Sequence, residues 1–316
     1  MRAQPLIVLG VGRSGTTLLR VILDRNSALA IPGESFFVTL LAYRHRGPLH
    51  VDAFIDDLRR LPTPREWGIS VDEVRPRLRA GMSTGEAVGV VFETFAEQQG
   101  KPRWGDKTPL YMQHLDLLER LFPDALFVHL VRDGRDAALS FLALPDGFSG
   151  RTWAQPGTVA QFAARWRTEV NAARALGRRV GSRYLELRYE DLVAEPEPAL
   201  QRVCAHASLS WEPGMLDYPG SVDVGKLPEH QRLTQPPTPG VRDWRIEMSA
   251  ADARAFEQVA GDVLRSSGYE LVEEGRYPTA RGRLELARFQ ALSRSWNAAA
   301  AAFQRSPLWR RTHPPL

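Results

Sequence analysis

The stretch LIVLGVGRSGTTLL, residues 6–19, combines an apolar segment, a glycine-rich turn and the start of a helical pattern. This order is typical of a phosphate-binding loop, in which backbone N–H groups and a helix N-terminus face an anion. Four residues separate Gly10 from Gly15, and Thr16-Thr17 follow, which nearly matches the GxxxxGK(S/T) loop of nucleoside triphosphatases. Thr16 stands where that loop has the lysine that reaches the β- and γ-phosphates. The sequence therefore indicates a nucleotide without a γ-phosphate.

The overall composition fits a globular protein with a substantial core. The chain has 316 residues, 43% of them hydrophobic, which is enough for one large domain or two small ones. No stretch approaches the roughly 20 apolar residues of a membrane span, and the N-terminus has no signal-peptide pattern. Cys204 is the only cysteine, so an internal disulfide is impossible. We therefore expect a cytoplasmic protein in which Cys204 is buried and inert.

Positive charge is concentrated at the C-terminal end of the sequence. The chain has 41 basic and 37 acidic residues, but residues 275–316 alone hold eight arginines and a single acid, Glu285. Without them, residues 1–274 carry a charge near −3, because eight basic residues and one acidic residue are subtracted from these totals. The basic character belongs to this tail, which argues against a nucleic-acid-binding body. We expect two units, a body at 1–274 and a tail at 275–316.

Apolar segments and helical patterns alternate along the body. The apolar segments lack period-2 alternation, so we expect a parallel sheet that is buried on both faces. The expected strands are residues 5–10, 103–106, 125–131 and 183–188. The expected helices are residues 16–26, 35–46, 51–61, 84–99, 111–122, 136–143, 158–180, 197–207 and 250–267, and a long loop is expected at 219–240. The predicted fold class is α/β, with a P-loop-type parallel sheet flanked by helices and a C-terminal helical tail.

A second cluster of polar residues follows the apolar segment at 125–131. The sequence there is Arg132-Asp133-Gly134-Arg135-Asp136, and Ser140 lies one helical turn further on. Ligands of open α/β sheets gather at the carboxyl ends of the strands, and a guanidinium group offers a planar fork of donors to a phosphate. A second phosphate site is one reading of this cluster. The other is a salt-bridged junction between a strand and a helix, for example Arg132 with Asp136.

Four stretches in the same order resemble a known family of enzymes. LGVGRSGTTLLRVILD, GDKTP, FVHLVRDGRDAALS and LELRYEDLVAEPE are similar to the sulfotransferases that use 3′-phosphoadenosine 5′-phosphosulfate (PAPS). The likeness is greatest to the tyrosylprotein-type enzymes and related bacterial proteins, and it extends over roughly residues 5–270. The donor of this family ends in a sulfate on a 5′-phosphate and also has a 3′-phosphate. The resemblance therefore explains both the missing lysine and the second cluster.

The resemblance implies which residues bind the donor. The loop that holds the 5′-phosphosulfate corresponds to Arg13, Ser14, Gly15, Thr16 and Thr17. Arg132 and Ser140 correspond to the pair that holds the 3′-phosphate, and Tyr189 to a residue near the nucleotide. A basic segment that closes over the nucleotide corresponds to Arg242, Trp244 and Arg245.

The resemblance also implies a catalytic pair. Glu34 lies twenty-one residues after Arg13, where the tyrosylprotein-type enzymes have their catalytic base, and Lys107 matches a lysine that stabilises the leaving phosphate. Sulfuryl transfer is an in-line displacement by an acceptor hydroxyl, which becomes a good nucleophile when a base takes its proton. Lys107 and Arg13 would oppose the charge that develops on the leaving group. This chemistry requires no metal, and the spacing of the histidines indicates no metal site.

Other interpretations of single residues remain open at this point. Glu34 could instead cap or pair near a helix start, Lys107 could be a solvated surface lysine, and Asp106 could orient Lys107. His129, within an apolar segment, is expected to be a hydrogen-bonded core histidine. Aromatic residues that could line an acceptor cleft, although helix-core packing is favoured, are Trp153, Phe162 and Trp166.

The acceptor and the competing functions are separate questions. The tyrosylprotein-type enzymes are membrane-anchored and have disulfides, and neither feature is expected here. A hydroxyl of a small molecule, lipid or glycan is therefore a better fit than a protein tyrosine. One competing interpretation is a P-loop kinase, in which Asp133 would imitate a magnesium-binding acid. The other is a nucleotide-binding protein without catalytic activity.

The tail has a pattern of its own. Apolar residues recur every three or four positions, at Leu286, Phe289, Leu292, Trp296, Ala300 and Phe303. Arginines flank this stripe, which predicts a basic amphipathic helix. Because the body is slightly acidic, we expect the helix to dock on its own body or on a second subunit rather than on a membrane surface.

Overall fold

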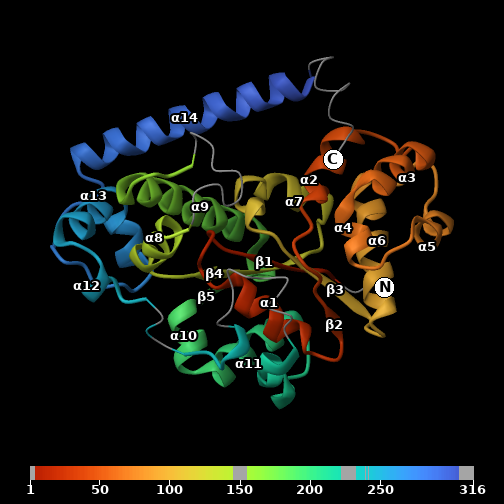
Figure 1. The fold of residues 1–316 in the computed structure, drawn as a ribbon, viewed down its shortest axis with the longest axis horizontal. Helices are drawn as coiled ribbons and strands as arrows, with labels where there is room; N and C mark the ends of the chain where they lie inside the picture. Colours follow the sequence, from red (N-terminus) through yellow and green to blue (C-terminus); the bar gives the residue numbers. More distant parts are fainter. Residues whose placement is uncertain (1–3, 145–154, 222–232, 239, 241, 306–316) are drawn as a thin grey trace.

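A parallel sheet lies at the centre of the molecule (Figure 1). The computed structural model describes residues 4–144, 155–221, 233–238, 240 and 242–305. The strand order is β2-β3-β1-β4-β5, and every neighbouring pair is parallel. The strands are β1 (Leu6–Leu9), β2 (Leu29–Ala30), β3 (Arg103–Lys107), β4 (Leu126–Val131) and β5 (Tyr184–Arg188). Because all strands run the same way, their carboxyl ends meet at one edge, where ligands of such sheets bind.

Helices cover both faces of the sheet. Alternate residues of β1 point to opposite faces, so Leu6 and Val8 join one hydrophobic cluster and Ile7 and Leu9 the other. The first cluster lies under α1 (Thr16–Asp24), α10 (Tyr189–Ala194), α11 (Pro196–Ala207) and η4 (Pro213–Ser221). The second lies under η2 (Pro109–Gln113), α7 (Leu115–Leu121), α8 (Gly134–Leu142), α9 (Val159–Val180) and α13 (Ala250–Ser266). The expected three-layer α/β arrangement is confirmed.

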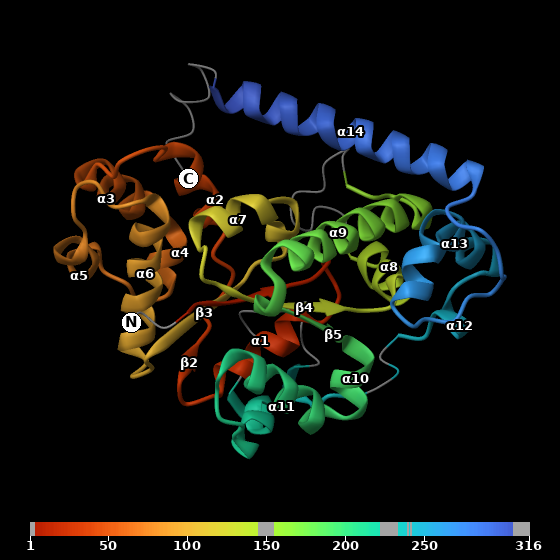
Figure 2. The ribbon, with the colours of Figure 1, turned by 180° about the vertical axis from the view of Figure 1, so that it is seen from behind.

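A helical lobe is inserted between β2 and β3 and stands beside that end of the sheet (Figure 2). Its elements are α2 (Phe37–Arg44), α3 (Val51–Arg60), α4 (Pro62–Glu66), α5 (Val71–Val74), η1 (Arg75–Arg77) and α6 (Thr84–Gln98). An aromatic stack ties the lobe to the sheet, since the Phe92 ring lies 4.5 Å from the Trp104 ring of β3 and 5.9 Å from Phe37 of α2. The lobe begins with α2, three residues after Glu34, and its aromatic side chains pack against the sheet.

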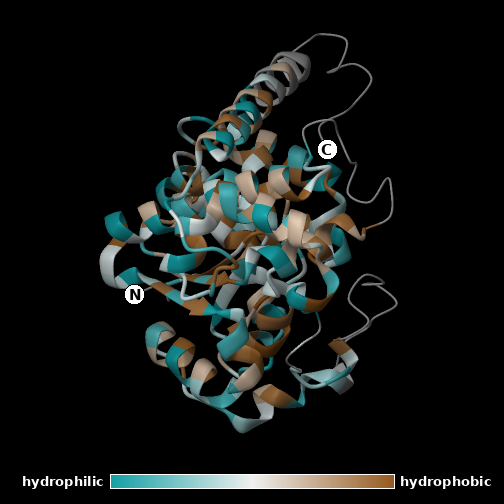
Figure 3. Ribbon diagram, turned by 90° about the vertical axis from the view of Figure 1, so that its left-hand side faces the viewer, coloured by the Kyte–Doolittle hydropathy of each residue, from teal (hydrophilic) through white to brown (hydrophobic). Residues whose placement is uncertain are grey.

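The short helix η3 (Gly181–Arg183) connects α9 to β5. Helix α12 (Trp244–Glu247) precedes α13, and the long helix α14 (Ala280–Arg305) follows it. Helix α14 lies across α9 and α13, and Figure 3 shows it above a body whose interior is the most hydrophobic part. Leu286 and Phe289 pack against the core cluster. At the first turn, Gly282 is so close to α13 that a Cβ atom would lie 1.8 Å from the Gln258 carbonyl oxygen. The backbones of the two helices are thus in direct contact.

Several sequence expectations differ from the structure in detail. The helix expected at 111–122 is divided, because His114 (φ −133°) interrupts it between η2 and α7. The helix expected from residue 136 begins at Gly134, since Asp133 caps it through the Arg135 amide. Phe162 and Trp166 are fully buried, as core packing predicts, and so are His129 and Cys204. Trp153, most of 222–241 and the side chains of Trp296, Ala300 and Phe303 lie outside the described residues.

Candidate active site

The loop between β1 and α1 has two residues with left-handed backbone angles, and only one of them is a glycine. Arg13 (φ 72°) and Gly15 (φ 87°) are both in the left-handed region. A Cβ atom at Gly10 would lie 2.5 Å from the Thr16 methyl group and 2.8 Å from the Leu130 carbonyl oxygen. The loop is therefore pressed between the start of α1 and the neighbouring strand β4. The loop lies at the carboxyl edge of the sheet and at the positive end of α1, whose first turn holds no acid.

Polar atoms around this loop suit an anionic ligand. Ser14 Oγ and Arg132 Nε are buried and have no hydrogen-bond partner among the described residues. Such atoms are costly to bury unless something else satisfies them. A Cβ atom at Gly15 would lie 2.5 Å from the Tyr189 ring, so this aromatic residue closes one side of the loop. The residues present therefore fit a nucleotide that has a phosphate or sulfate group at the loop.

The two clusters that the sequence suggested lie side by side. Arg13 Nε donates a hydrogen bond to Ser140 Oγ at 3.1 Å, although 127 positions separate the two residues. Arg132 Nη1 donates to the Arg13 carbonyl oxygen at 3.2 Å. The Arg132 guanidinium group also lies over the Tyr189 ring, 4.6 Å from its centroid. The ends of β1, β4 and β5 thus bring Arg13, Arg132, Ser140 and Tyr189 into one cationic patch.

Glu34 and Lys107 form an ion pair at the other side of the loop. Lys107 Nζ donates to Glu34 Oε1 and, at 3.2 Å, to Thr17 Oγ1. Only 2% of the Lys107 side chain is exposed, whereas 30% of the Glu34 side chain is, so the interpretation of Lys107 as a solvated lysine is wrong. Burial lowers the pKa of Lys107, and the Glu34 carboxylate opposes that shift. The pair therefore places a partly accessible carboxylate and a buried ammonium group beside the phosphate-binding loop.

Arg20 is a site residue that sequence reasoning missed. It lies on α1, one turn after the loop, and Nη1 donates to the carbonyl oxygens of Ile31 (3.1 Å) and Pro32 (3.5 Å). Burial lowers the pKa of Arg20, and the Glu34 charge opposes that shift. Arg20 thus holds the segment that leads to Glu34. Its spacing of four residues from Thr16 indicates a neighbouring position on α1, but the contact with residues 31–32 depends on the tertiary fold.

Comparison with known proteins identifies the family. The sequence profile of the sulfotransferase family matches residues 5–213. The chain belongs to the sulfotransferase family. It is 25% identical over 225 residues to protein-tyrosine sulfotransferase A of Caenorhabditis elegans, a match that covers 69% of this chain and 53% of the worm protein. It is 27% identical over 317 residues to nodulation protein NoeE of Sinorhizobium fredii, which covers 88% of this chain and 72% of NoeE.

Solved structures of the sulfotransferase family share the fold. The sulfotransferase domain of the Synechococcus olefin synthase has a TM-score of 0.56 and 24% identity, and the match covers 85% of this chain and 97% of that domain. The chain spans about half the length of the worm relative, 53%. The family and the fold are therefore shown.

The segment that the family resemblance assigns to the nucleotide cover makes other contacts here. Arg242 pairs with Glu247, and Arg245 Nη2 lies 3.1 Å from a Glu270 oxygen. The Trp244 ring lies under the Arg135 guanidinium group, 3.6 Å from it. Both guanidinium groups of the segment are thus directed to carboxylates instead of the loop. Their role toward the nucleotide stays a prediction.

The structure also bears on the competing kinase interpretation. Both carboxylate oxygens of Asp133 accept hydrogen bonds from the buried Arg135, at 3.0 and 2.7 Å. Arg135 is further paired with Glu257 at 2.8 Å, so this cluster is a structural joint between α8 and α13. Asp133 is therefore not free to bind magnesium as a P-loop kinase would require. Within the described ranges, no group of three or more acids, histidines or cysteines is arranged to hold a metal ion, and no helix there has the length and hydrophobicity of a membrane span.

Proposed function

We propose that this protein transfers the sulfuryl group of PAPS to the hydroxyl group of a small molecule, lipid or glycan. The observation that carries the proposal is the chain of contacts from Glu34 through Lys107 to Thr17. It connects a partly exposed carboxylate to the phosphate-binding loop through one buried ammonium group. A base, a cation and an anion site in this order are what sulfuryl transfer to a hydroxyl needs.

Two sets of residues would hold the donor. The loop at Arg13–Thr17 and the amino end of α1 suit the 5′-phosphosulfate. The buried Ser14 hydroxyl, which has no hydrogen-bond partner among the described residues, can donate to it. Arg132 and Ser140 suit the 3′-phosphate, and Arg132 Nε is a second buried donor without a hydrogen-bond partner among the described residues. Tyr189 offers a ring face beside both groups, and Arg242, Trp244 and Arg245 are proposed to cover the nucleotide. When bound, the donor supplies the sulfuryl group and a good leaving group.

The roles of this chain's residues follow from their positions. The acceptor oxygen forms a bond to sulfur while the bond from sulfur to the bridging oxygen breaks. The electron pair of that bond goes to the 5′-phosphate of adenosine 3′,5′-bisphosphate, which leaves. The acceptor proton passes to the Glu34 carboxylate, and Lys107 and Arg13 oppose the negative charge on the leaving phosphate. The Lys107 ammonium group also pairs with the Glu34 carboxylate and so fixes its position beside the loop.

The remaining assignments extend the proposal to the whole chain. We propose that residues 1–274 form the sulfotransferase domain and that residues 275–316 form a tail that docks on its own body. Contacts of Leu286, Phe289 and Gly282 with the body support docking. A second subunit and a membrane surface are the alternatives. A cytoplasmic location stays a prediction.

A binding experiment and a transfer experiment test the proposed function. Adenosine 3′,5′-bisphosphate should raise the melting temperature without magnesium, whereas ATP with magnesium should have a smaller effect. Radiolabelled PAPS should then transfer its label to one member of a panel of phenols, sterols and sugars in a single turnover. Protection by ATP with magnesium alone would favour the kinase. Binding of the bisphosphate without transfer or donor hydrolysis would favour a non-catalytic nucleotide-binding protein.

A further inference from the structure

Asp106 is a buried carboxylate that contacts three hydroxyl groups. It lies on β3 directly before Lys107, and its exposed fraction is 1%. Ser35 Oγ donates to Asp106 Oδ2 at 2.7 Å, Thr108 Oγ1 donates to Oδ1 at 3.4 Å, and the Tyr111 hydroxyl donates to Oδ2. We call these four residues the Asp106 cluster. Its carboxylate is satisfied by neutral donors, an uncommon arrangement for a buried charge.

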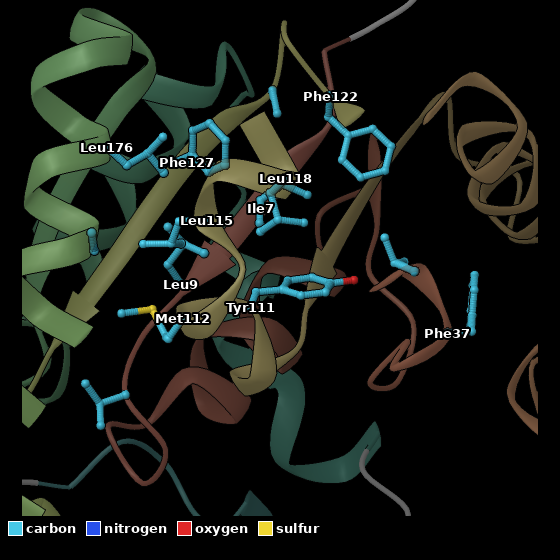
Figure 4. Packing of buried hydrophobic residues seen from close by; sticks show 14 of the residues in the cluster. Ile7, Leu9, Phe37, Tyr111, Met112, Leu115, Leu118, Phe122, Phe127 and Leu176 are labelled. Carbon is cyan, nitrogen blue, oxygen red and sulfur yellow. The ribbon is translucent and has the colours of Figure 1, made fainter. Parts of the chain in front are cut away.

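The Asp106 cluster does not act by contact with the Lys107 side chain. Neighbouring residues of a strand point to opposite faces of the sheet. Lys107 faces α1 and Thr17, whereas Asp106 faces the side of Tyr111. In Figure 4 the Tyr111 ring lies within the hydrophobic cluster, and its hydroxyl group points toward the side of the cluster where Phe37 lies. The sequence-based idea that Asp106 orients Lys107 therefore requires a route through the backbone.

Such a route exists, because the cluster joins the two segments that carry Glu34 and Lys107. Ser35, the residue after Glu34, has two hydrogen bonds to the carboxyl end of β3 and the residue that follows it: its hydroxyl donates to Asp106, and its amide N–H donates to Thr108 Oγ1 at 2.9 Å. Asp106 and Thr108 flank Lys107 on both sides. Glu34 and Lys107 are thus each one residue away from the same set of hydrogen bonds.

The segment after Glu34 has a backbone that needs such an anchor. Phe36 has a φ of 25°, outside the usual regions for a residue with a side chain, and 53% of it is exposed. Ser35 and Phe37, on either side, are buried. Unfavourable backbone angles persist where neighbouring contacts fix them, and they are frequent at active sites. Anchoring of Ser35 by the cluster, together with burial of Phe37, accounts for this conformation.

We propose that the Asp106 cluster is a positioning device that fixes the Glu34 carboxylate and the Lys107 ammonium group relative to each other. This inference rests on the proposed function, because it assigns Glu34 as base. Burial raises the pKa of Asp106 to about 6, and the hydrogen bonds from Tyr111 and Ser35 oppose that shift. Near neutral pH the carboxylate is therefore ionised and accepts from all three hydroxyls.

The test uses two single variants, Asp106→Asn and Tyr111→Phe. Each changes one hydrogen-bonding group of the cluster and keeps the size of the side chain. The matched control is Tyr184→Phe, which deletes a hydroxyl group that contacts His129 Nδ1 at 2.6 Å, away from the site. Amide hydrogen exchange of residues 33–37 is measured with adenosine 3′,5′-bisphosphate bound. Sulfate release from radiolabelled PAPS is measured with water as acceptor. We expect faster exchange at 33–37 and a loss of about tenfold in kcat for both cluster variants, with bisphosphate affinity within about twofold of the wild type.

A double-mutant cycle separates positioning from a general loss of stability. If Asp106 acts through Glu34, Asp106→Asn should cost much less in the Glu34→Gln background than in the wild type. Equal costs in both backgrounds, with unchanged exchange at 33–37, would overturn the inference. Should Glu34→Gln itself keep wild-type turnover, the proposed base is wrong, and the exchange rates still decide whether the cluster fixes this segment. Tyr184→Phe should lower the melting temperature and leave kcat unchanged.

Discussion

The Lys107 ammonium group lies 3.2 Å from the Thr17 hydroxyl oxygen and also pairs with Glu34. Thr17 is the second residue of α1, at the end of the phosphate-binding loop, so this contact joins the loop to the proposed base. Because Lys107 is nearly fully buried, its charge is poorly screened by water. One ammonium group can therefore act on the proposed base and on the leaving phosphate.

Lys107→Ala should lower kcat about 100-fold, the scale for loss of one fixed charge at a developing anion. Burial lowers the pKa of Lys107, so in the wild type this group loses its proton at a lower pH than an ordinary lysine does. The wild-type kcat should therefore begin to fall at an alkaline pH that is below the usual pKa of lysine. This fall in kcat at alkaline pH should be absent from Lys107→Ala. The control is Lys101→Ala, since Lys101 Nζ donates to the Leu29 carbonyl oxygen at 3.0 Å near the opposite edge of the sheet. Equal kcat values for Lys107→Ala and the wild type would remove Lys107 from the catalytic pair.

Arg132→Ala should weaken the binding of adenosine 3′,5′-bisphosphate by ~2 kcal/mol, about 30-fold in Kd. The reason is the loss of a charge-assisted contact to the 3′-phosphate. Titration calorimetry checks the prediction, with adenosine 5′-monophosphate as a ligand for which the loss should be smaller. Arg183→Ala is the matched control, because Arg183 Nη1 donates to the Ala125 carbonyl oxygen at 2.9 Å at the amino ends of the strands. An equal loss for both nucleotides would argue against a 3′-phosphate contact.

Asp136→Asn should stabilise the protein increasingly as the pH rises from about 4 to about 7. Burial and the nearby Asp133 charge raise the pKa of Asp136 from its ordinary 3.8 to about 7. The folded protein therefore keeps this proton over a range in which the unfolded chain has lost it, so the wild type loses stability as the pH rises through that window. The variant still accepts the Trp244 amide hydrogen bond through its side-chain oxygen. Melting temperatures across pH 4 to 8 check this, with the exposed Asp56→Asn as control; a constant difference between variant and wild type would contradict the shift.

Gly282→Val should lower the melting temperature by several degrees, because any Cβ atom at this position collides with the Gln258 carbonyl oxygen of α13. Truncation after residue 274 should have a similar effect, since it uncovers the core surface under Leu286 and Phe289. Truncation after residue 305 is the control. Melting temperatures and mass in solution are measured together with flotation on anionic vesicles. Flotation that requires the tail, with unchanged stability and mass, would show a membrane-surface role instead.

Local sequence signals predicted the parts of the site that depend on neighbouring residues. Glycine spacing predicted the loop at Gly10–Thr17, and a charged residue at a strand end predicted the role of the arginine after β4. Uninterrupted apolar segments predicted the fold class. Strand β2 was missed because Leu29–Ala30 is too short for a periodicity. The segment with Arg242 and Arg245 shows what local signals cannot predict. Both arginines pair with carboxylates, and the sequence does not indicate that these carboxylates lie close to them.

The Asp106 cluster could not be predicted for a related reason. Its members come from residue 35 and from residues 106–111, which meet only because the chain enters β3 beside β2 and the helical lobe. Strand order is a property of the whole sheet, and single-residue patterns do not encode it. Arg20 is a similar case, because its contact with residues 31–32 arises where the chain leaves β2 beside α1.

The most direct test of the central claim is kcat of Glu34→Gln in single-turnover transfer from radiolabelled PAPS. The amide keeps the shape of the side chain but cannot take the acceptor proton. We predict a loss of about 100-fold or more in kcat, with the affinity for adenosine 3′,5′-bisphosphate within about twofold of the wild type. A wild-type rate in this variant, with normal folding and normal bisphosphate binding, would contradict the assignment of Glu34 as the base.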